Sequence, residues 1–162
     1  MGTVRLLEKL QPADPPSAMD LASCLKCLNQ FLAEEVQPAL TTVLQGFFRS
    51  TQLVGTGGTA TIMAKIELEL SSFDRDRIEA IRLRRDQIDS QLQRLWSVPL
   101  EQRRAIAGLP PNRADVILAG VAIYKSVMEC FDFPELIVST RGLRYAAVMD
   151  DIDMSSADLA HS

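Results

Sequence analysis

Hydrophobic residues recur at helical spacing along much of the chain, and the clearest case follows Ser17. Asp20 lies three residues after Ser17, which is the spacing of a helix-capping box. The Gln37-Pro38 pair should end or kink this helix, and "ALTTVLQGFF" could continue as a second short one. The apolar positions that predict the first helix are Leu21, Cys24, Leu25, Leu28, Phe31 and Leu32.

Four later segments also have helical patterns. "TATIMAKIELEL" follows a glycine-rich loop, and "VPLEQRRAIAGLPP" is a short helix closed by Gly108. Asn112 opens the most apolar helix, "RADVILAGVAIYKSVMECF", which should be the central packed helix, with Gly120 allowing a neighbouring backbone to approach. "DQIDSQLQRLW" carries one apolar face, formed by Ile88, Leu92, Leu95 and Trp96.

Strands are predicted between these helices. They are a short one over Thr3–Leu7, the buried "TQLVG", a half-exposed strand over residues 75–83 and the buried "FPELIVST". "RGLRYAAVMDDI" reads as a turn and helix, and residues 151–162 as a frayed tail. Strands that alternate with helices indicate an α/β fold with a mainly parallel sheet.

Composition is that of one ordinary soluble domain. The 162 residues are 47% hydrophobic and 23% charged, with a net charge of −4, which predicts no broad attraction to nucleic acid or to an anionic membrane. The longest apolar run, Val116–Ile123, is far shorter than the ~20 residues of a membrane span. No signal-peptide pattern opens the chain, so a cytoplasmic location is expected.

Few side chains offer catalytic chemistry. Cys24 and Cys27 lie three apart on the predicted helix and are interpreted as packing residues rather than as a redox pair or half a zinc site. The only histidine is His161, so no histidine-based triad is expected. The pairs Glu34-Glu35 and Asp150-Asp151 fall at expected surface helix ends and receive no catalytic assignment. The arginines among residues 75–85 are interleaved with acidic residues and indicate a solvated face.

The strongest candidate for binding is the loop in "LVGTGGTATIMAK", residues 53–65. A strand, a glycine turn and a helix starting at Thr59 would gather backbone N–H groups that favour an anion. A Walker loop is excluded because no Lys-Ser or Lys-Thr pair follows the glycines. Gly55, Gly57 and Ala60 do satisfy the dinucleotide fingerprint GxGxx[GA]. A tight turn without any ligand is the third interpretation.

Four ordered segments resemble the exopolyphosphatase/guanosine pentaphosphate phosphatase (Ppx/GppA) family. "MGTVRLLEKL" with "DPPS" resembles the family's "lGavRLtE…dPps", and "LVGTGGTAT" is similar to its glycine-threonine loop. "GLPPNRADVILAG" resembles "GLxxxRADvilaG", and "VSTRGLRYAAV" resembles "vSxrGLReGl". The resemblance spans residues 1 to about 149 and implies an actin-like ATPase (RNase H-like) half-domain, with a mixed sheet and flanking helices.

In this family, phosphoanhydride hydrolysis takes place in a cleft between two halves, usually with magnesium. The resemblance places residues 1–150 in the second half and implies that the "DxGSNS" and "DxGGGS" loops and the activating glutamate are missing. The implied ligand is polyphosphate or a guanosine polyphosphate, and the implied partner is the missing N-terminal half-domain. No catalytic or metal-binding residue is assigned to this chain, which is expected to be inert alone. An uncovered sheet edge would favour homo-oligomers.

The resemblance also assigns individual residues. Gly55, Gly57, Gly58, Thr59 and Arg144 would bind phosphate or nucleotide, while Arg113, Asp115, Ser139 and Gly142 would order the site. An ion pair between Arg113 and Asp115 is one way to do so, although Asp115 also suits simple helix capping. Tyr145 and Ala146 depart from the family's usual glutamate and glycine.

Two other functions stay open: an NAD(P)-binding Rossmann-like module and a non-enzymatic interaction domain. Strand order separates the first from the phosphatase. A dinucleotide fold needs the loop strand in the centre of the sheet, with a parallel buried neighbour following its helix. The phosphatase half-domain would instead place residues 75–83 in a peripheral strand.

Overall fold

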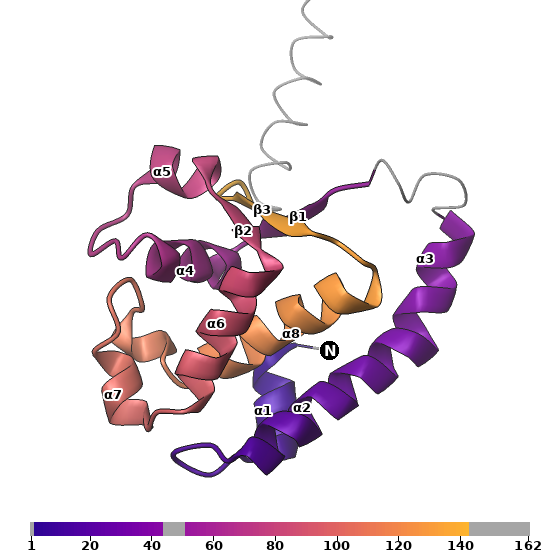
Figure 1. The fold of residues 1–162 in the computed structure, drawn as a ribbon, viewed down its shortest axis with the longest axis horizontal. Helices are drawn as coiled ribbons and strands as arrows, with labels where there is room; N and C mark the ends of the chain where they lie inside the picture. Colours follow the sequence, from indigo (N-terminus) through magenta and orange to yellow (C-terminus); the bar gives the residue numbers. More distant parts are fainter. Residues whose placement is uncertain (1, 44–50, 143–162) are drawn as a thin grey trace, which may run out of the picture.

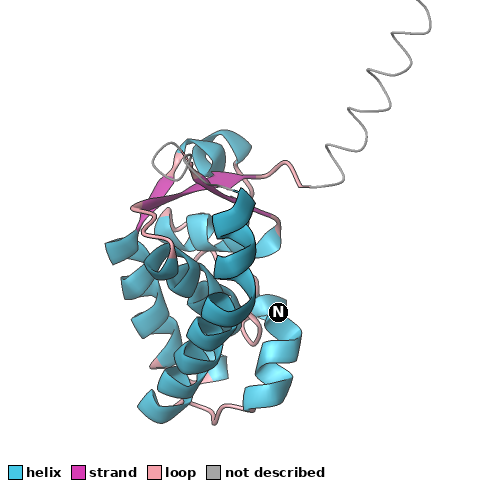
Figure 2. Cartoon of the chain, turned by 90° about the vertical axis from the view of Figure 1, so that its right-hand side faces the viewer, coloured by secondary structure: helices cyan, strands magenta, loops and turns pink. Residues whose placement is uncertain are grey.

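A small sheet lies at one end of a bundle of helices in the computed structural model of the chain, which describes residues 2–43 and 51–142 (Figures 1 and 2). The predicted helix in "RGLRYAAVMDDI", the tail 151–162, Arg144 and the Asp150-Asp151 pair lie outside the described residues. The first helices are α1 (Thr3–Leu10), α2 (Ala18–Phe31), a π-helical turn (Leu32–Val36) and α3 (Gln37–Val43).

The strand expected at residues 3–7 is wrong, because Thr3–Leu10 is helical. Leu6 is fully buried and Leu7 and Leu10 are partly buried, so one helical face meets the core. Val4, on the opposite face, is 54% exposed. The segment is short enough to satisfy either pattern, and packing on a neighbouring helix favours the helical one.

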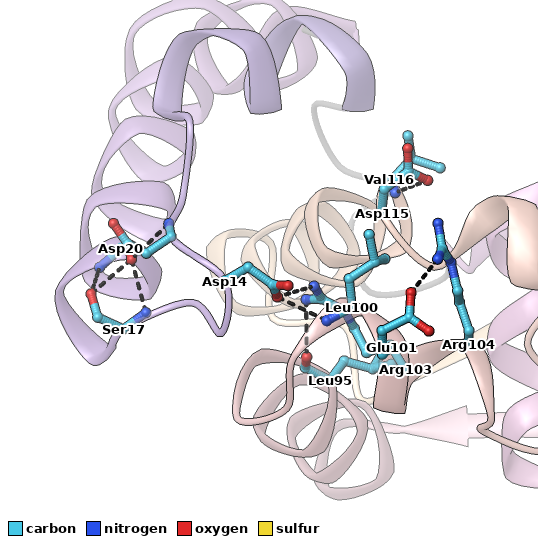
Figure 3. A network of polar contacts seen from close by, with 11 residues as sticks. Asp14, Ser17, Asp20, Leu95, Leu100, Glu101, Arg103, Arg104, Asp115 and Val116 are labelled. Atoms are coloured by element: carbon cyan, nitrogen blue, oxygen red, sulfur yellow. Dashed lines mark hydrogen bonds and ion pairs between the residues drawn. The ribbon is translucent and has the colours of Figure 1, made fainter.

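The predicted start of α2 is confirmed. The Ser17 hydroxyl oxygen accepts a hydrogen bond from the Asp20 N–H at 3.1 Å, and the Asp20 carboxylate accepts one from the Ser17 N–H at 2.8 Å (Figure 3). The chain does not leave the helical conformation at Gln37-Pro38, where an end or a kink was predicted; α2 is followed by the π turn, and the second short helix, α3, begins at Gln37. The irregularity lies one turn earlier, in the π turn, which accommodates a proline that has no N–H to donate.

The sheet is mixed, with strand order β1-β3-β2. β1 (Leu53–Thr56) runs parallel to β3 (Glu135–Ser139), and β2 (Arg82–Arg84) runs antiparallel to β3. The central strand is β3, as its buried Leu136 and Val138 require. The α/β class and the mixed sheet implied by the resemblance are therefore confirmed, whereas the mainly parallel sheet expected from the alternation of strands and helices is wrong.

Most of the strand predicted over residues 75–83 is a helix, α5 (Arg75–Ala80). The Asp74 carboxylate caps this helix by accepting from the Arg77 N–H at 3.1 Å. Alternation of apolar and charged residues suggested a strand, but the cap and a single buried side chain, Ile78, suit one and a half helical turns. Within the described sheet β1 is an edge strand and β2 is antiparallel to its neighbour, which does not match a dinucleotide fold.

The remaining helices surround one apolar core. Helix α8 lies at its centre and contacts α1, α2, α4 and α6 (Figure 1). The predicted apolar face of "DQIDSQLQRLW" is confirmed, because Ile88, Leu92, Leu95 and Trp96 are buried. Among the described residues, no helix is long and apolar enough to cross a bilayer. The remaining helices of this core are α4 (Gly58–Glu67), α6 (Arg85–Trp96), α7 (Leu100–Arg104), a 3-10 turn (Pro111–Arg113) and α8 (Ile117–Cys130).

Arg85 departs from the solvated face predicted for the arginine cluster. Its guanidinium donates to the Phe133 carbonyl at 2.7 Å and the Met128 carbonyl at 3.0 Å, and it pairs with Asp132 at 2.8 Å. These acceptors lie at and beyond the end of α8, where carbonyl groups lack helical partners. Arg85 therefore stabilises the connection from α8 to β3.

Candidate functional site

The glycine loop forms the predicted strand–turn–helix unit. β1 ends at Thr56, Gly57 adopts a positive φ of 86°, and α4 begins at Gly58, one residue before the expected start. Positive φ is the conformation that glycine adopts without strain. The first N–H groups of α4 have no intrahelical acceptors and lie at the positive end of the helix dipole.

A hollow of about 150 Å³ lies beside this helix end. It brings together Gly58, Thr59 and Arg113, three residues that the sequence assigned to the site. Arg113 is exposed and forms no ion pair with any described residue, so its charge is available to an anion. Thr3, Ile62, Val116 and Ile117 complete the lining.

Asp115 faces a different hollow. Its carboxylate accepts from the Val116 N–H at 2.8 Å (Figure 3). The ion pair considered between Arg113 and Asp115 is absent. This second hollow, of about 390 Å³, also contains Asp14 and the buried Arg103, which pair at 3.3 Å. The helix-capping expectation for Asp115 is wrong, because α8 begins at Ile117, its N-cap residue Val116 has no side-chain cap, and Asp115 contacts only the adjacent N–H.

Gly55 contributes to packing rather than to the hollow. It is buried in β1, and a Cβ atom there would lie 2.9 Å from the Tyr124 hydroxyl and 3.0 Å from a Leu136 methyl. Gly57 and Gly58, in contrast, have no atom within 4 Å of an added Cβ. The loop thus has two parts. Gly55 allows α8 to pack closely against β1, whereas Gly57 and Gly58 leave the N-terminus of α4 uncovered.

The turn after β3 lies at the same edge of the sheet. Thr56 pairs in register with Ser139, so the carboxyl ends of the two parallel strands are neighbours. Parallel sheets bind ligands at this end. The Ser139 hydroxyl oxygen accepts from the Arg141 N–H at 3.2 Å, and Gly142 is the last described residue. Ser139 and Gly142 therefore lie at the expected edge, whereas Arg144 stays a prediction.

Glu79 is a contact of this turn that the sequence did not indicate. Its carboxylate accepts from the Thr140 N–H at 3.1 Å and also from the Thr140 hydroxyl. The side-chain hydrogen bond from Thr140 is the main cause that lowers the pKa of Glu79, and the nearby Arg141 and Arg75 add to it. The partners are 61 residues apart, so no local pattern could show the contact.

Replacing Glu79 by glutamine should weaken the pH dependence of stability. A lowered folded-state pKa stabilises the fold above the unfolded-state pKa, and this contribution disappears as pH falls through the folded-state value. We therefore expect E79Q to melt below the wild type at pH 7, and the difference to disappear as the pH falls through the lowered folded-state pKa of Glu79. Calorimetry across this range measures the difference. A constant difference at every pH would contradict it.

The described residues do not form a magnesium site. No group of three or more His, Cys, Asp and Glu side chains gathers in the described ranges. The polar side chains around the 150 Å³ hollow are hydroxyls and one guanidinium, and magnesium prefers carboxylates.

Cys24 is buried in α2, where burial raises the pKa of its thiol to about 11, as suits a packing residue.

The chain is similar to known phosphatases over nearly its whole length. The profile of the Ppx/GppA phosphatase family matches residues 1–154. Exopolyphosphatase 2 of Mycobacterium tuberculosis is 28% identical over 159 residues, which are 98% of this chain and 44% of that protein. A bifunctional 3-dehydroquinate synthase/phosphatase of Fusobacterium nucleatum is 26% identical over 101 residues, which are 62% of this chain and 15% of that protein.

Solved structures show the same fold. A crystal structure of the Aquifex aeolicus Ppx/GppA family member matches with a TM-score of 0.79 at 26% identity, covering 95% of this chain and 47% of that one. An exopolyphosphatase from Cytophaga hutchinsonii matches with a TM-score of 0.73 at 22% identity, covering 94% and 48%. The chain thus spans about half the length of exopolyphosphatase 2 and of these two solved structures.

Proposed function

Because the chain belongs to the Ppx/GppA phosphatase family, we propose that it forms one wall of a cleft in which terminal phosphoanhydride bonds of inorganic polyphosphate or guanosine pentaphosphate are hydrolysed. The observation that carries the proposal is the shared hollow of the α4 N-terminus and Arg113. Both features favour a phosphoryl group, the first through backbone N–H donors and the second through a guanidinium. The other wall would come from a half-domain that the described residues do not contain.

In this proposal the protein binds the polyphosphate and stabilises negative charge on its terminal phosphoryl group. Water attacks the terminal phosphorus in line, and the donors of α4 and Arg113 face oxygens that gain charge in the transition state. No carboxylate lines the hollow within the described residues. In this proposal the group that activates water comes from the other half. Magnesium would neutralise phosphate charge, and the described residues supply no cluster of ligands for it.

The proposal predicts binding without hydrolysis by the isolated chain. Replacing Arg113 by glutamine should weaken binding of polyphosphate about 5- to 30-fold, the loss expected for one hydrogen-bonded charge of 1–2 kcal/mol. Titration calorimetry measures this affinity, and phosphate release measures hydrolysis. Arg94→Gln is the matched control, because Arg94 is exposed on α6 and does not line the hollow.

Two results would overturn parts of this proposal. Equal losses of affinity in R113Q and R94Q would show that polyphosphate binds through general charge rather than at the hollow. Release of phosphate by the purified chain alone, at rates similar to those of full-length relatives, would show that the chain has its own catalytic groups. Neither result would change the assignment of the chain to the Ppx/GppA family.

A further inference from the structure

The second hollow, of about 390 Å³, is formed by three segments that are far apart in the sequence. They are α1 with the loop that follows it, the start of α7, and the turn before α8. The volume is that of a small-molecule pocket. Much of the wall is apolar, and it includes the buried Leu118, the partly buried Leu7, and Val4, which is 54% exposed. A small molecule with an apolar part would cover this surface, which is favourable in water.

A buried charge lies in the wall of this hollow. Arg103 lines it although the residue is only 3% exposed. Its guanidinium has two described acceptors, the Leu95 carbonyl at 3.4 Å and the Asp14 carboxylate at 3.3 Å (Figure 3). Both distances are longer than the usual range of N–H···O hydrogen bonds, and the buried Nε–H has no acceptor among the described residues. A guanidinium can donate more hydrogen bonds than these, so Arg103 can also donate to a carboxylate.

Asp14 can accept from a cation in addition to Arg103. Its Oδ1 atom accepts from the Leu100 N–H at 2.8 Å and from Arg103, whereas Oδ2 has no hydrogen bond to a described residue. The Asp14 side chain is 53% exposed, so the carboxylate is open to a ligand. Glu8 and Asp115 also line the hollow and form no ion pair within the described ranges. The hollow thus presents hydrogen-bond donors and acceptors side by side.

We propose that the second hollow binds a free α-amino acid with an apolar side chain. The α-ammonium group would donate to the Asp14 carboxylate, and the α-carboxylate would accept from the Arg103 guanidinium. The two charged groups of an amino acid are attached to one carbon atom, and Asp14 and Arg103 are likewise neighbours, at 3.3 Å. The apolar side chain would lie against Leu7 and Leu118. Buried charges need such partners, and the ligand would supply one for Arg103.

The charges of the lining favour this ligand over simpler ones. An acid without an ammonium group would add negative charge beside three carboxylates, those of Glu8, Asp14 and Asp115. A phosphate-containing ligand is disfavoured for the same reason. An amine without a carboxylate would lie beside Arg103 and leave its N–H groups without an acceptor. The two hollows therefore select different ligands, and binding of an amino acid does not require that the chain bind polyphosphate.

Titration calorimetry with the 162-residue chain tests the site with L-leucine and L-phenylalanine. We expect at least one of them to bind with a Kd of about 1 mM or lower. The tighter one is then compared with its decarboxylated amine and with its deaminated acid. Each of these analogues should bind at least tenfold more weakly, because each leaves one charge of the Asp14–Arg103 pair without its partner. This comparison uses the unmodified chain and does not depend on the folding of a variant.

Asp14→Asn locates the binding. Asparagine keeps an acceptor for the Leu100 N–H but loses the negative charge, so affinity for the amino acid should fall at least tenfold. Asp89→Asn is the matched control, because Asp89 is 48% exposed, pairs with the mostly buried Lys125 at 2.7 Å and does not line the hollow. No binding of either amino acid at millimolar concentrations, an amine that binds as tightly as the amino acid, or equal losses in D14N and D89N would each overturn the proposal.

Discussion

Replacing Gly108 by alanine is expected to destabilise the fold by about 3–5 kcal/mol, the range of severe backbone and packing defects. Gly108 has a φ of 83°, and a Cβ atom there would lie 2.3 Å from the Lys65 carbonyl oxygen and 2.6 Å from the Ile66 nitrogen. These are backbone atoms of α4, so no side-chain rotation relieves the overlap. The segment after α7 must move away from α4, or α4 must bend.

Urea denaturation followed by far-UV circular dichroism measures the loss. Gly58→Ala is the control, because Gly58 begins α4 with a negative φ and an added Cβ would meet no atom within 4 Å. Its free energy of unfolding should stay within about 1 kcal/mol of the wild type, since alanine is a better helix former than glycine. A Gly108→Ala variant within 1 kcal/mol of the wild type would show that the two segments separate easily.

Local patterns in the sequence were sufficient where structure depends on neighbours along the chain. Ser17 and Asp20 cap α2 as expected, and the face from Ile88 to Trp96 is buried as expected. The positive φ of Gly57 and the start of α4 also follow from residues within one short loop. Capping and helical periodicity act over three or four residues, which is why these features can be recognised without a structure.

Features that depend on distant partners could not be predicted in the same way. Arg103 is 3% exposed and pairs with Asp14, which lies 89 residues earlier, and burial lowers the pKa of its guanidinium. Nothing near Arg103 in the sequence distinguishes it from the exposed Arg104 (Figure 3). The contact between Glu79 and Thr140 is hidden for the same reason.

Two short segments were mispredicted because their hydrophobic residues fit both the period of a strand and the period of a helix. The run from Thr3 to Leu10 and the run from Arg75 to Ala80 are each too short to separate a period of two from one of 3.6. Contacts made elsewhere decide the outcome: Leu6 meets the core, and Asp74 caps α5. Within the glycine loop, likewise, the requirement for Gly55 is shown only by the side chains that pack around it, those of Tyr124, Ala60 and Leu136.

Gly120 of α8 connects the core to the candidate site through Thr59. A Cβ atom at Gly120 would lie 2.5 Å from the Thr59 methyl carbon and 3.1 Å from its hydroxyl oxygen. The Gly120→Ala variant should therefore lose about 1–3 kcal/mol, the usual range for overpacking, even though alanine favours a helix. Because Thr59 lines the 150 Å³ hollow, the same variant should also bind polyphosphate more weakly.

A double-mutant cycle isolates this contact. Thr59→Ser removes the methyl group but keeps the hydroxyl, so it should restore most of the stability and the polyphosphate affinity that Gly120→Ala loses. We expect a coupling free energy of at least about 1 kcal/mol between the two sites, within the range measured for residues in contact. Additive effects would mean that the strain is relieved elsewhere in α8. Coupling in both stability and affinity would show that packing of α8 on α4 sets the position of Thr59 at the hollow.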